Sequence, residues 1–234
     1  MFRPSKNHVA LIVVGLGLAG PQFGNAATPH PSRMSRILVF GDSLSEGPML
    51  KPSEAYPMLL VGKLRAAGLN FEVTNASQTG GTTADGLERL PRHLKQRTDI
   101  FILELGVNDA FRGTPIDQIR ENLQEIIDRV RDANPAVRIV ICGMQLPNHS
   151  ANDYVSAFGK MYVDLAAKNN AALVPYLLAG VAGDPQVNLF DGFHPNAAGH
   201  KILAENVWLI LEPIAREVAN SSSPQRMPSP QSSS

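Results

Sequence analysis

Short apolar runs alternate along the chain with longer stretches in which apolar residues recur every three or four positions. The short runs are rich in β-branched residues and almost continuously hydrophobic, which is typical of strands covered on both faces. They predict five strands, over residues 36–40, 71–75, 99–105, 137–142 and 171–175.

The longer stretches have the spacing of amphipathic helices. They predict helices over residues 54–67, 83–95, 115–133, 153–169 and from 196 to about 218, with Pro115 in a first helical turn. Strands that alternate with helices in this way predict βα units on a parallel sheet, so the fold class is α/β. Ligands bind at the carboxyl ends of the strands in such sheets, and candidate chemistry is therefore sought in the loops that follow them.

The two ends of the chain differ from the middle. Residues 1–27 contain basic residues, then an apolar run over 9–19, then small residues, which predicts a signal peptide cleaved after Ala26 or Ala27 and a periplasmic or secreted protein. The run is shorter than the roughly 20 residues of a spanning helix. Translation from Met34 would instead give a cytoplasmic protein. We expect one domain over 34–219 and a disordered tail rich in Ser, Pro and Gln over 220–234.

Composition narrows the possible partners. The 234 residues are 44% hydrophobic, and 21 basic side chains balance 21 acidic ones, so net charge gives no support for a nucleic acid or an anionic membrane surface as partner. The single cysteine, Cys142, lies in an apolar run; it excludes an internal disulfide and a thiolate metal cluster, and we expect it to be a small buried hydrophobe.

A serine and a histidine with a neighbouring acid stand at predicted loops far apart in the chain. Ser43 follows the first strand at a turn after Gly41, and Asp191 precedes His194 by three residues just before the last helix. A serine needs a base to act as a nucleophile, and an aspartate fixes the tautomer of a histidine that serves as that base. These residues predict a catalytic triad of Ser43, His194 and Asp191.

Two further loops contain hydrogen-bond donors suited to a negatively charged oxygen. Gly80 and Gly81 follow the second strand, and Asn108 follows the third. Acyl transfer forms an oxyanion that backbone N–H groups and side-chain amides stabilise. We predict an oxyanion hole made of the Ser43 N–H, the Gly80 N–H and the Asn108 amide, with the choice between Gly80 and Gly81 left open in favour of Gly80.

Taken together, these four blocks resemble those of the SGNH or GDSL hydrolases. The matching segments are 41–45, Gly80, 106–109 and 191–194, and the likeness extends from about residue 36 to 213. It is closest to the bacterial thioesterase I, protease I and lysophospholipase group, which also includes arylesterases. A serine hydrolase of the other common scaffold would show Gly-x-Ser-x-Gly, whereas Ser45 stands two positions after Ser43.

The resemblance implies a flavodoxin-like three-layer α/β/α sandwich with a parallel sheet of about five strands. It further implies hydrolysis of carboxylic esters or acyl thioesters through an acyl-enzyme, on small-molecule esters, thioesters or lysophospholipids. We expect no cofactor, no metal and a monomer. The loop after the fourth strand flanks the acyl pocket in such enzymes, which makes Met144, Leu146 and Pro147 candidates for substrate binding, and it also contains His149.

Three alternatives remain at this stage. A carbohydrate O-acetyl esterase fits the same resemblance, although the one tryptophan, Trp208, lies in a predicted helix rather than on a sugar platform. A non-catalytic flavodoxin-like module would bind phosphate at the turn over residues 80–83. A metal-dependent hydrolase would need a third ligand beside Asp191 and His194. His93 and His200 are interpreted as structural.

Overall fold

The computed structural model describes residues 34–147 and 153–222. The predicted signal peptide, His149 and the part of the predicted tail beyond residue 222 lie outside these ranges. Within them, no helix is both long enough and apolar enough to cross a membrane.

A five-stranded sheet in the order β2-β1-β3-β4-β5 forms the middle layer, and every pairing in it is parallel. The prediction of a parallel α/β sheet is therefore confirmed. The strands are β1 (Ser35–Gly41), β2 (Phe71–Asn75), β3 (Ile100–Glu104), β4 (Arg138–Cys142) and β5 (Ala172–Val174).

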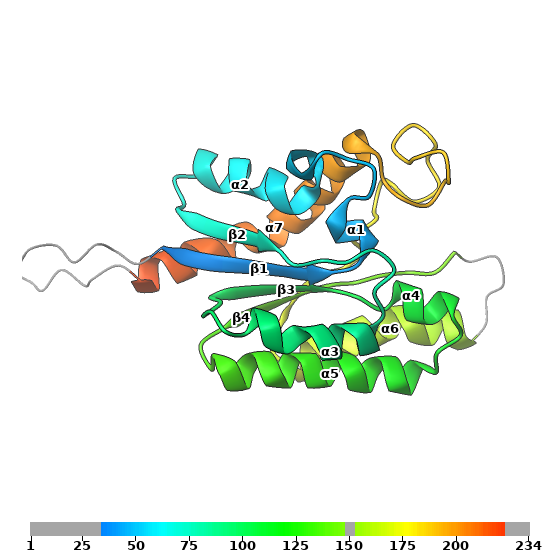
Figure 1. Ribbon diagram of the computed structural model, residues 1–234, viewed down its shortest axis with the longest axis horizontal. Helices are drawn as coiled ribbons and strands as arrows, with labels where there is room; N and C mark the ends of the chain where they lie inside the picture. The colour runs from blue at the N-terminus through cyan, green and yellow to red at the C-terminus, as the bar shows by residue number, and fades with distance from the viewer. Residues whose placement is uncertain (1–33, 148–152, 223–234) are drawn as a thin grey trace, which may run out of the picture. The chain divides into compact units, whose positions relative to one another are not determined.

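Helices cover both faces of the sheet, which makes the three predicted layers (Figure 1). One outer layer contains α2 (Tyr56–Ala66) and α7 (Ala197–Ser222), and the other contains α3 (Thr83–His93), α5 (Ile116–Ala133) and α6 (Asp153–Lys168). The short helices α1 (Ser43–Glu46) and α4 (Val107–Phe111) lie at the carboxyl ends of the strands, and a 3₁₀ turn, η1 (Pro52–Glu54), precedes α2.

The core fills the space between these layers. All five residues of β3 are buried, and Val39, Ile102 and Val140 on neighbouring strands have no exposed surface. Burying a side chain of this kind contributes roughly 1.5–3 kcal/mol, so the continuous apolar runs explain why the strands are central. Cys142 is also fully buried, as expected for a small hydrophobe.

Several helix limits differ from those predicted. The helix expected from residue 54 begins at Tyr56, because Pro57 lacks an N–H and occupies the first turn, while Ala55 stays extended. Pro115 is the N-cap of α5 rather than a helical residue. The last helix continues to Ser222, beyond the predicted end near residue 218 and into the predicted tail.

Candidate active site

The nucleophile candidate begins a short helix at the carboxyl end of β1. Asp42 caps this helix, because its Oδ1 accepts from the Leu44 N–H at 3.0 Å. The helix ends after one turn at Gly47, whose φ of 76° is left-handed. Ser43 is thereby held at the edge of the sheet, as the first residue of α1.

Gly41 leaves space for the side chains of neighbouring residues. A Cβ at this position would lie 2.5 Å from Glu104 Oε2 and 2.6 Å from Ser45 Oγ. Gly41 pairs with Glu104 in the parallel register of β1 and β3. The missing side chain therefore makes room for a buried carboxyl beneath the turn.

The acid and the base lie in the loop before α7. Asp191 Oδ1 accepts from the backbone N–H groups of Phe193 and His194, both at 2.9 Å, and its Oδ2 lies 2.6 Å from His194 Nδ1. Gly192, with a φ of 70°, allows the turn between them. The hydrogen bond from His194, followed by the Phe193 N–H, lowers the pKa of Asp191 to about 2.

The fold brings this loop against the nucleophile turn. His194 Nε2 lies 3.0 Å from Ser43 Oγ, across 151 positions of sequence. The loop is held in place where the Leu189 N–H donates to the His194 carbonyl at 2.7 Å, and Asn196 Oδ1 accepts from the second and third N–H groups of α7. An unbroken hydrogen-bonded chain therefore runs from Asp191 through His194 to Ser43.

The glycine loop follows β2 at the same edge. Gly80 has a φ of 72°, and its carbonyl accepts from Arg112 Nη2 at 3.0 Å. The Gly81 N–H is already engaged with the Gln78 carbonyl at 3.0 Å. The buried guanidinium of Arg89 donates to the carbonyls of Ala76 and Gly41, which joins the start of this loop to the end of β1.

Asn108, in α4, joins the nucleophile turn after β1 to the glycine loop after β2. Its Nδ2 donates to Asp42 Oδ2 at 3.0 Å and to the Gly81 carbonyl at 3.1 Å. The next residue, Asp109, accepts from both the N–H and the hydroxyl of Thr83, at 2.8 and 2.6 Å, and so joins α4 to the first residue of α3. The sequence-predicted residues Ser43, Gly80, Asn108, Asp191 and His194 thus all lie at the carboxyl edge of the sheet.

Two buried carboxyls beneath the nucleophile were not predicted as part of the site. Asp42 and Glu104 have no exposed surface. Burial raises the pKa of Asp42, and burial together with the charge of Asp42 raises the pKa of Glu104 well above its usual range. The sequence indicates this pair only through Glu104, which is an acid at the end of an otherwise apolar strand.

An apolar cavity of about 600 Å³ opens beside the histidine. Met144, Leu146 and Pro147, the predicted substrate-binding residues, all line it. Aromatic residues that the sequence did not single out also contribute: Phe193 packs edge-on against both Phe111 and His194, with ring centroids 5.2 and 5.0 Å apart. The remaining lining residues are Val107, Gln145, Tyr176, Leu178, Ala182, Gly183 and Gly192.

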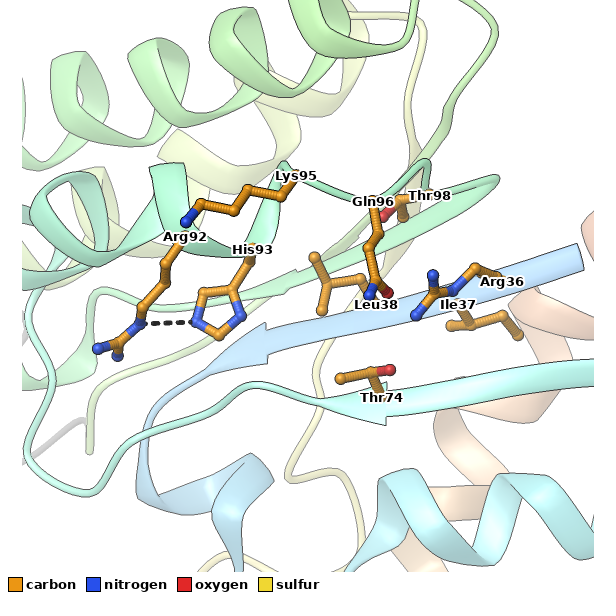
Figure 2. Close-up of a pocket in the computed structure, with 9 residues that line it drawn as sticks. All are labelled: Arg36, Ile37, Leu38, Thr74, Arg92, His93, Lys95, Gln96 and Thr98. Atoms are coloured by element: carbon orange, nitrogen blue, oxygen red, sulfur yellow. Dashed lines mark hydrogen bonds between the residues drawn. The ribbon is translucent and has the colours of Figure 1, made fainter.

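A smaller hollow of about 250 Å³ lies beside the carboxyl end of α3, on β1 and β2 (Figure 2). It contains His93, whose Nε2 accepts from Arg92 Nε at 3.1 Å, and none of the predicted site residues lines it. The other histidine interpreted as structural, His200, is fully buried and accepts from the Tyr56 N–H through Nδ1 at 3.1 Å.

Metal-ligating residues do not gather in the described part of the chain: no group of three or more His, Cys, Asp or Glu side chains there could hold a metal ion. The chemistry available at the carboxyl edge is that of a hydroxyl, an imidazole, a carboxylate and several N–H donors.

A serine, a histidine and an aspartate linked by hydrogen bonds at the edge of a parallel sheet are the arrangement of a serine hydrolase. The model of the GDSL-like Lipase/Acylhydrolase family matches residues 39–202, and the chain belongs to that family. The resemblance found in the sequence is thereby confirmed.

Named relatives indicate the reaction. The chain is 37% identical to Esterase TesA of Pseudomonas aeruginosa over 76% of this chain and 88% of that protein. It is 35% identical to Thioesterase 1/protease 1/lysophospholipase L1 of Escherichia coli K12, over 76% of this chain and 84% of the relative. The crystal structure of TesA superposes with a TM-score of 0.73 at 36% identity, over 77% of this chain and 99% of that one. The protein is an ester or thioester hydrolase that acts on small-molecule substrates.

Proposed function

We propose that Ser43 is the nucleophile of this hydrolase, that His194 is its general base and acid, and that Asp191 orients His194. The observation that carries the proposal is the hydrogen-bonded chain Asp191 Oδ2 to His194 Nδ1 at 2.6 Å and His194 Nε2 to Ser43 Oγ at 3.0 Å. With Nδ1 donating to the carboxylate, Nε2 is left as the acceptor that a serine hydroxyl requires.

The reaction follows from this geometry. Ser43 Oγ attacks the acyl carbonyl while its proton passes to His194 Nε2, which forms a tetrahedral oxyanion. His194 then returns that proton to the leaving alkoxide or thiolate, and the acyl group stays on Ser43. A water molecule attacks the acyl-enzyme with His194 again as base, which releases the acid and restores the serine.

The proposed oxyanion hole consists of the N–H groups of Ser43 and Gly80 and the amide of Asn108. The bond from the Gly81 N–H to Gln78 favours Gly80 as the backbone donor from this loop. Both hydrogens of the Asn108 amide have acceptors in the structure, Asp42 Oδ2 and the Gly81 carbonyl. The oxyanion would therefore replace one of them, and the longer bond, to Gly81, is the one we expect to yield.

The apolar cavity supports an acyl chain as the group held beside the triad. Phe193 lines the cavity and touches His194, so a chain placed there would lead to the reacting carbonyl. A volume of about 600 Å³ exceeds what an acetyl group needs, and this favours longer acyl groups over the O-acetyl substrates considered as an alternative.

Hydrolysis of p-nitrophenyl esters from acetate to palmitate, by the wild type and by Ser43→Ala, tests the assignment. We expect the variant to lose activity by several orders of magnitude while it remains folded, since removing a triad member leaves only residual catalysis. In the wild type, kcat/KM should rise with acyl length. Leu146→Trp should lower it about 10- to 100-fold for long chains and leave acetate unchanged. Full activity of Ser43→Ala would refute the assignment.

We also propose that the enzyme is exported, with residues 1–27 as signal peptide, and that it works as a monomer. The order of basic, apolar and small residues supports export. Mass spectrometry of protein from the periplasm would locate the cleavage site, and light scattering would give the oligomeric state. A full-length cytoplasmic product would contradict export, and a stable dimer would contradict the second proposal.

A further inference from the structure

Glu104 ends β3 directly beneath the nucleophile turn. Its Oε2 accepts from the Asp42 N–H at 3.1 Å and from the Ser45 hydroxyl at 2.7 Å. Ser45 Oγ in turn lies 2.8 Å from the hydroxyl of Tyr56, which belongs to α2. Asp42 and Ser45 flank Ser43, so one carboxyl oxygen holds the turn on both sides of the nucleophile.

The packing around this oxygen leaves little room for another arrangement. Gly41 faces Glu104 across β1 and β3, and even a methyl group at Gly41 would lie 2.5 Å from Oε2. Glu104, Ser45 and Tyr56 are fully buried. The contact between β3 and the turn is therefore built in before any substrate binds.

Stability alone does not explain an acid at this position. Burying a carboxyl is costly, and here a second buried carboxyl, Asp42, stands beside it. Among the described residues, Glu104 Oε1 has no hydrogen-bond partner, which adds to the cost. A leucine of similar size would avoid both penalties but would accept no hydrogen bond from the turn.

We propose that Glu104 is a positioning residue, which fixes the nucleophile turn from below so that Ser43 Oγ stays within reach of His194 and the Ser43 N–H faces the oxyanion. This inference rests on the proposed role of Ser43. It assigns Glu104 an effect on the rate of the chemical step rather than on the binding of substrate.

The test compares Glu104→Leu with Glu104→Gln in p-nitrophenyl ester hydrolysis. Leucine accepts no hydrogen bond, and since a displacement near 1 Å can cost 10²-fold, we expect kcat to fall about 100-fold with KM changed less than about threefold. Glutamine keeps one acceptor oxygen and should restore kcat to within about fivefold of the wild type. Equal losses in both variants, or a loss confined to KM, would overturn the proposal.

Asp99→Leu is the matched control for the loss of a buried carboxyl. Asp99 stands just before β3, at the opposite end of that strand, with its side chain 4% exposed and its Oδ2 accepting from the Arg36 N–H at 2.9 Å. We expect a lower melting temperature and kcat within about twofold of the wild type per folded molecule, because the turn is untouched. A 100-fold loss of kcat in Asp99→Leu would show that the effect of Glu104→Leu is general destabilisation, and would overturn the proposal.

Two other variants keep the result interpretable. If Glu104→Leu does not fold, Ser45→Ala removes one of the two donors to Glu104, and we expect kcat to fall about tenfold, as for one lost buried hydrogen bond; wild-type kcat would overturn the proposal.

Ser43→Ala distinguishes the failure of this inference from the failure of the nucleophile assignment on which it rests. If Ser43→Ala is inactive and Glu104→Leu is not impaired, only the role of Glu104 fails; if Ser43→Ala is active, the nucleophile assignment fails first.

Discussion

The amide of Asn108 donates to Oδ2 of Asp42 at 3.0 Å, so the proposed oxyanion donor is tied to the residue that precedes the nucleophile. Asp42 Oδ1 meanwhile caps the helix that begins with Ser43. One buried carboxylate thus sets the positions of two groups that must act on the same carbonyl.

Removal of the amide donor should slow the chemical step. For Asn108→Ala we expect kcat to fall about 10²- to 10³-fold with a much smaller change in KM, as for other oxyanion donors. Asn108→Asp has the same shape but offers no donor when ionised, and should lose at least as much. Steady-state kinetics with a p-nitrophenyl ester measures both; near wild-type kcat in Asn108→Ala would show that the amide does not donate to the oxyanion.

Asp191→Asn should impair the rate far more than the fold. An asparagine would orient His194 in the wrong tautomer, and we expect a loss in kcat of about 10⁴-fold, as in other triads. Because Asp191 lies in a partly exposed loop, its replacement should shift the melting temperature little. Calorimetry and kinetics on one preparation give both values, and turnover close to that of the wild type would rule out the proposed role.

Two glycines with different surroundings should respond oppositely to alanine. In Gly41→Ala the new Cβ would meet Glu104 Oε2 and Ser45, and overpacking of this kind costs about 1–3 kcal/mol. Gly62, in α2, has open space around an added Cβ, so Gly62→Ala should stabilise the protein by up to about 1 kcal/mol. Urea unfolding compares them. A neutral Gly41→Ala would mean that the carboxyl is not fixed there.

His200 should make stability depend on pH. Burial, and next the nearby His194, lower the pKa of His200 to about 4, whereas an unfolded histidine titrates near 6.5. Between these values the unfolded chain binds a proton that the native state does not, so stability falls as the pH drops from about 6.5 to about 4, by up to about 3 kcal/mol.

In His200→Asn that contribution disappears, although the smaller side chain lowers stability at every pH. Urea unfolding at intervals from pH 7 to pH 4.5 should therefore give a shallower decline for the variant than for the wild type. Parallel curves for the two proteins would contradict the assigned pKa of His200.

Much of the fold could be predicted because the apolar runs are long and regular. The limits of β2 agree with the pattern to the residue, and the other strands differ by one position at one or both ends. The helices α1 and α4 have only four and five residues, too few to show a period, and they were not predicted. Capping by Asp42 and the φ of 121° at Gly106, the N-cap of α4, define them instead.

The site residues likewise divide into those that a local sequence pattern predicts and those that it does not. Ser43, Asn108, Asp191 and His194 closely follow a predicted strand or precede a predicted helix, where polar residues are candidates for chemistry. Glu104 lies in a run that the pattern predicts as a hydrophobic strand, and its partners Ser45 and Tyr56 come from other elements, so no local pattern joins them. The apolar cavity combines Phe111 of α4 with Phe193 of the loop before α7, and their contact depends on how these distant segments fold.

The most direct test of the nucleophile assignment is to trap it. A p-nitrophenyl alkylphosphonate forms a stable adduct with an activated serine, and peptide mapping by mass spectrometry would show where it sits. We predict one adduct per chain on Ser43, with none in Ser43→Ala and slow labelling in His194→Ala. An adduct on another residue, or equal labelling of Ser43→Ala, would contradict the proposed mechanism.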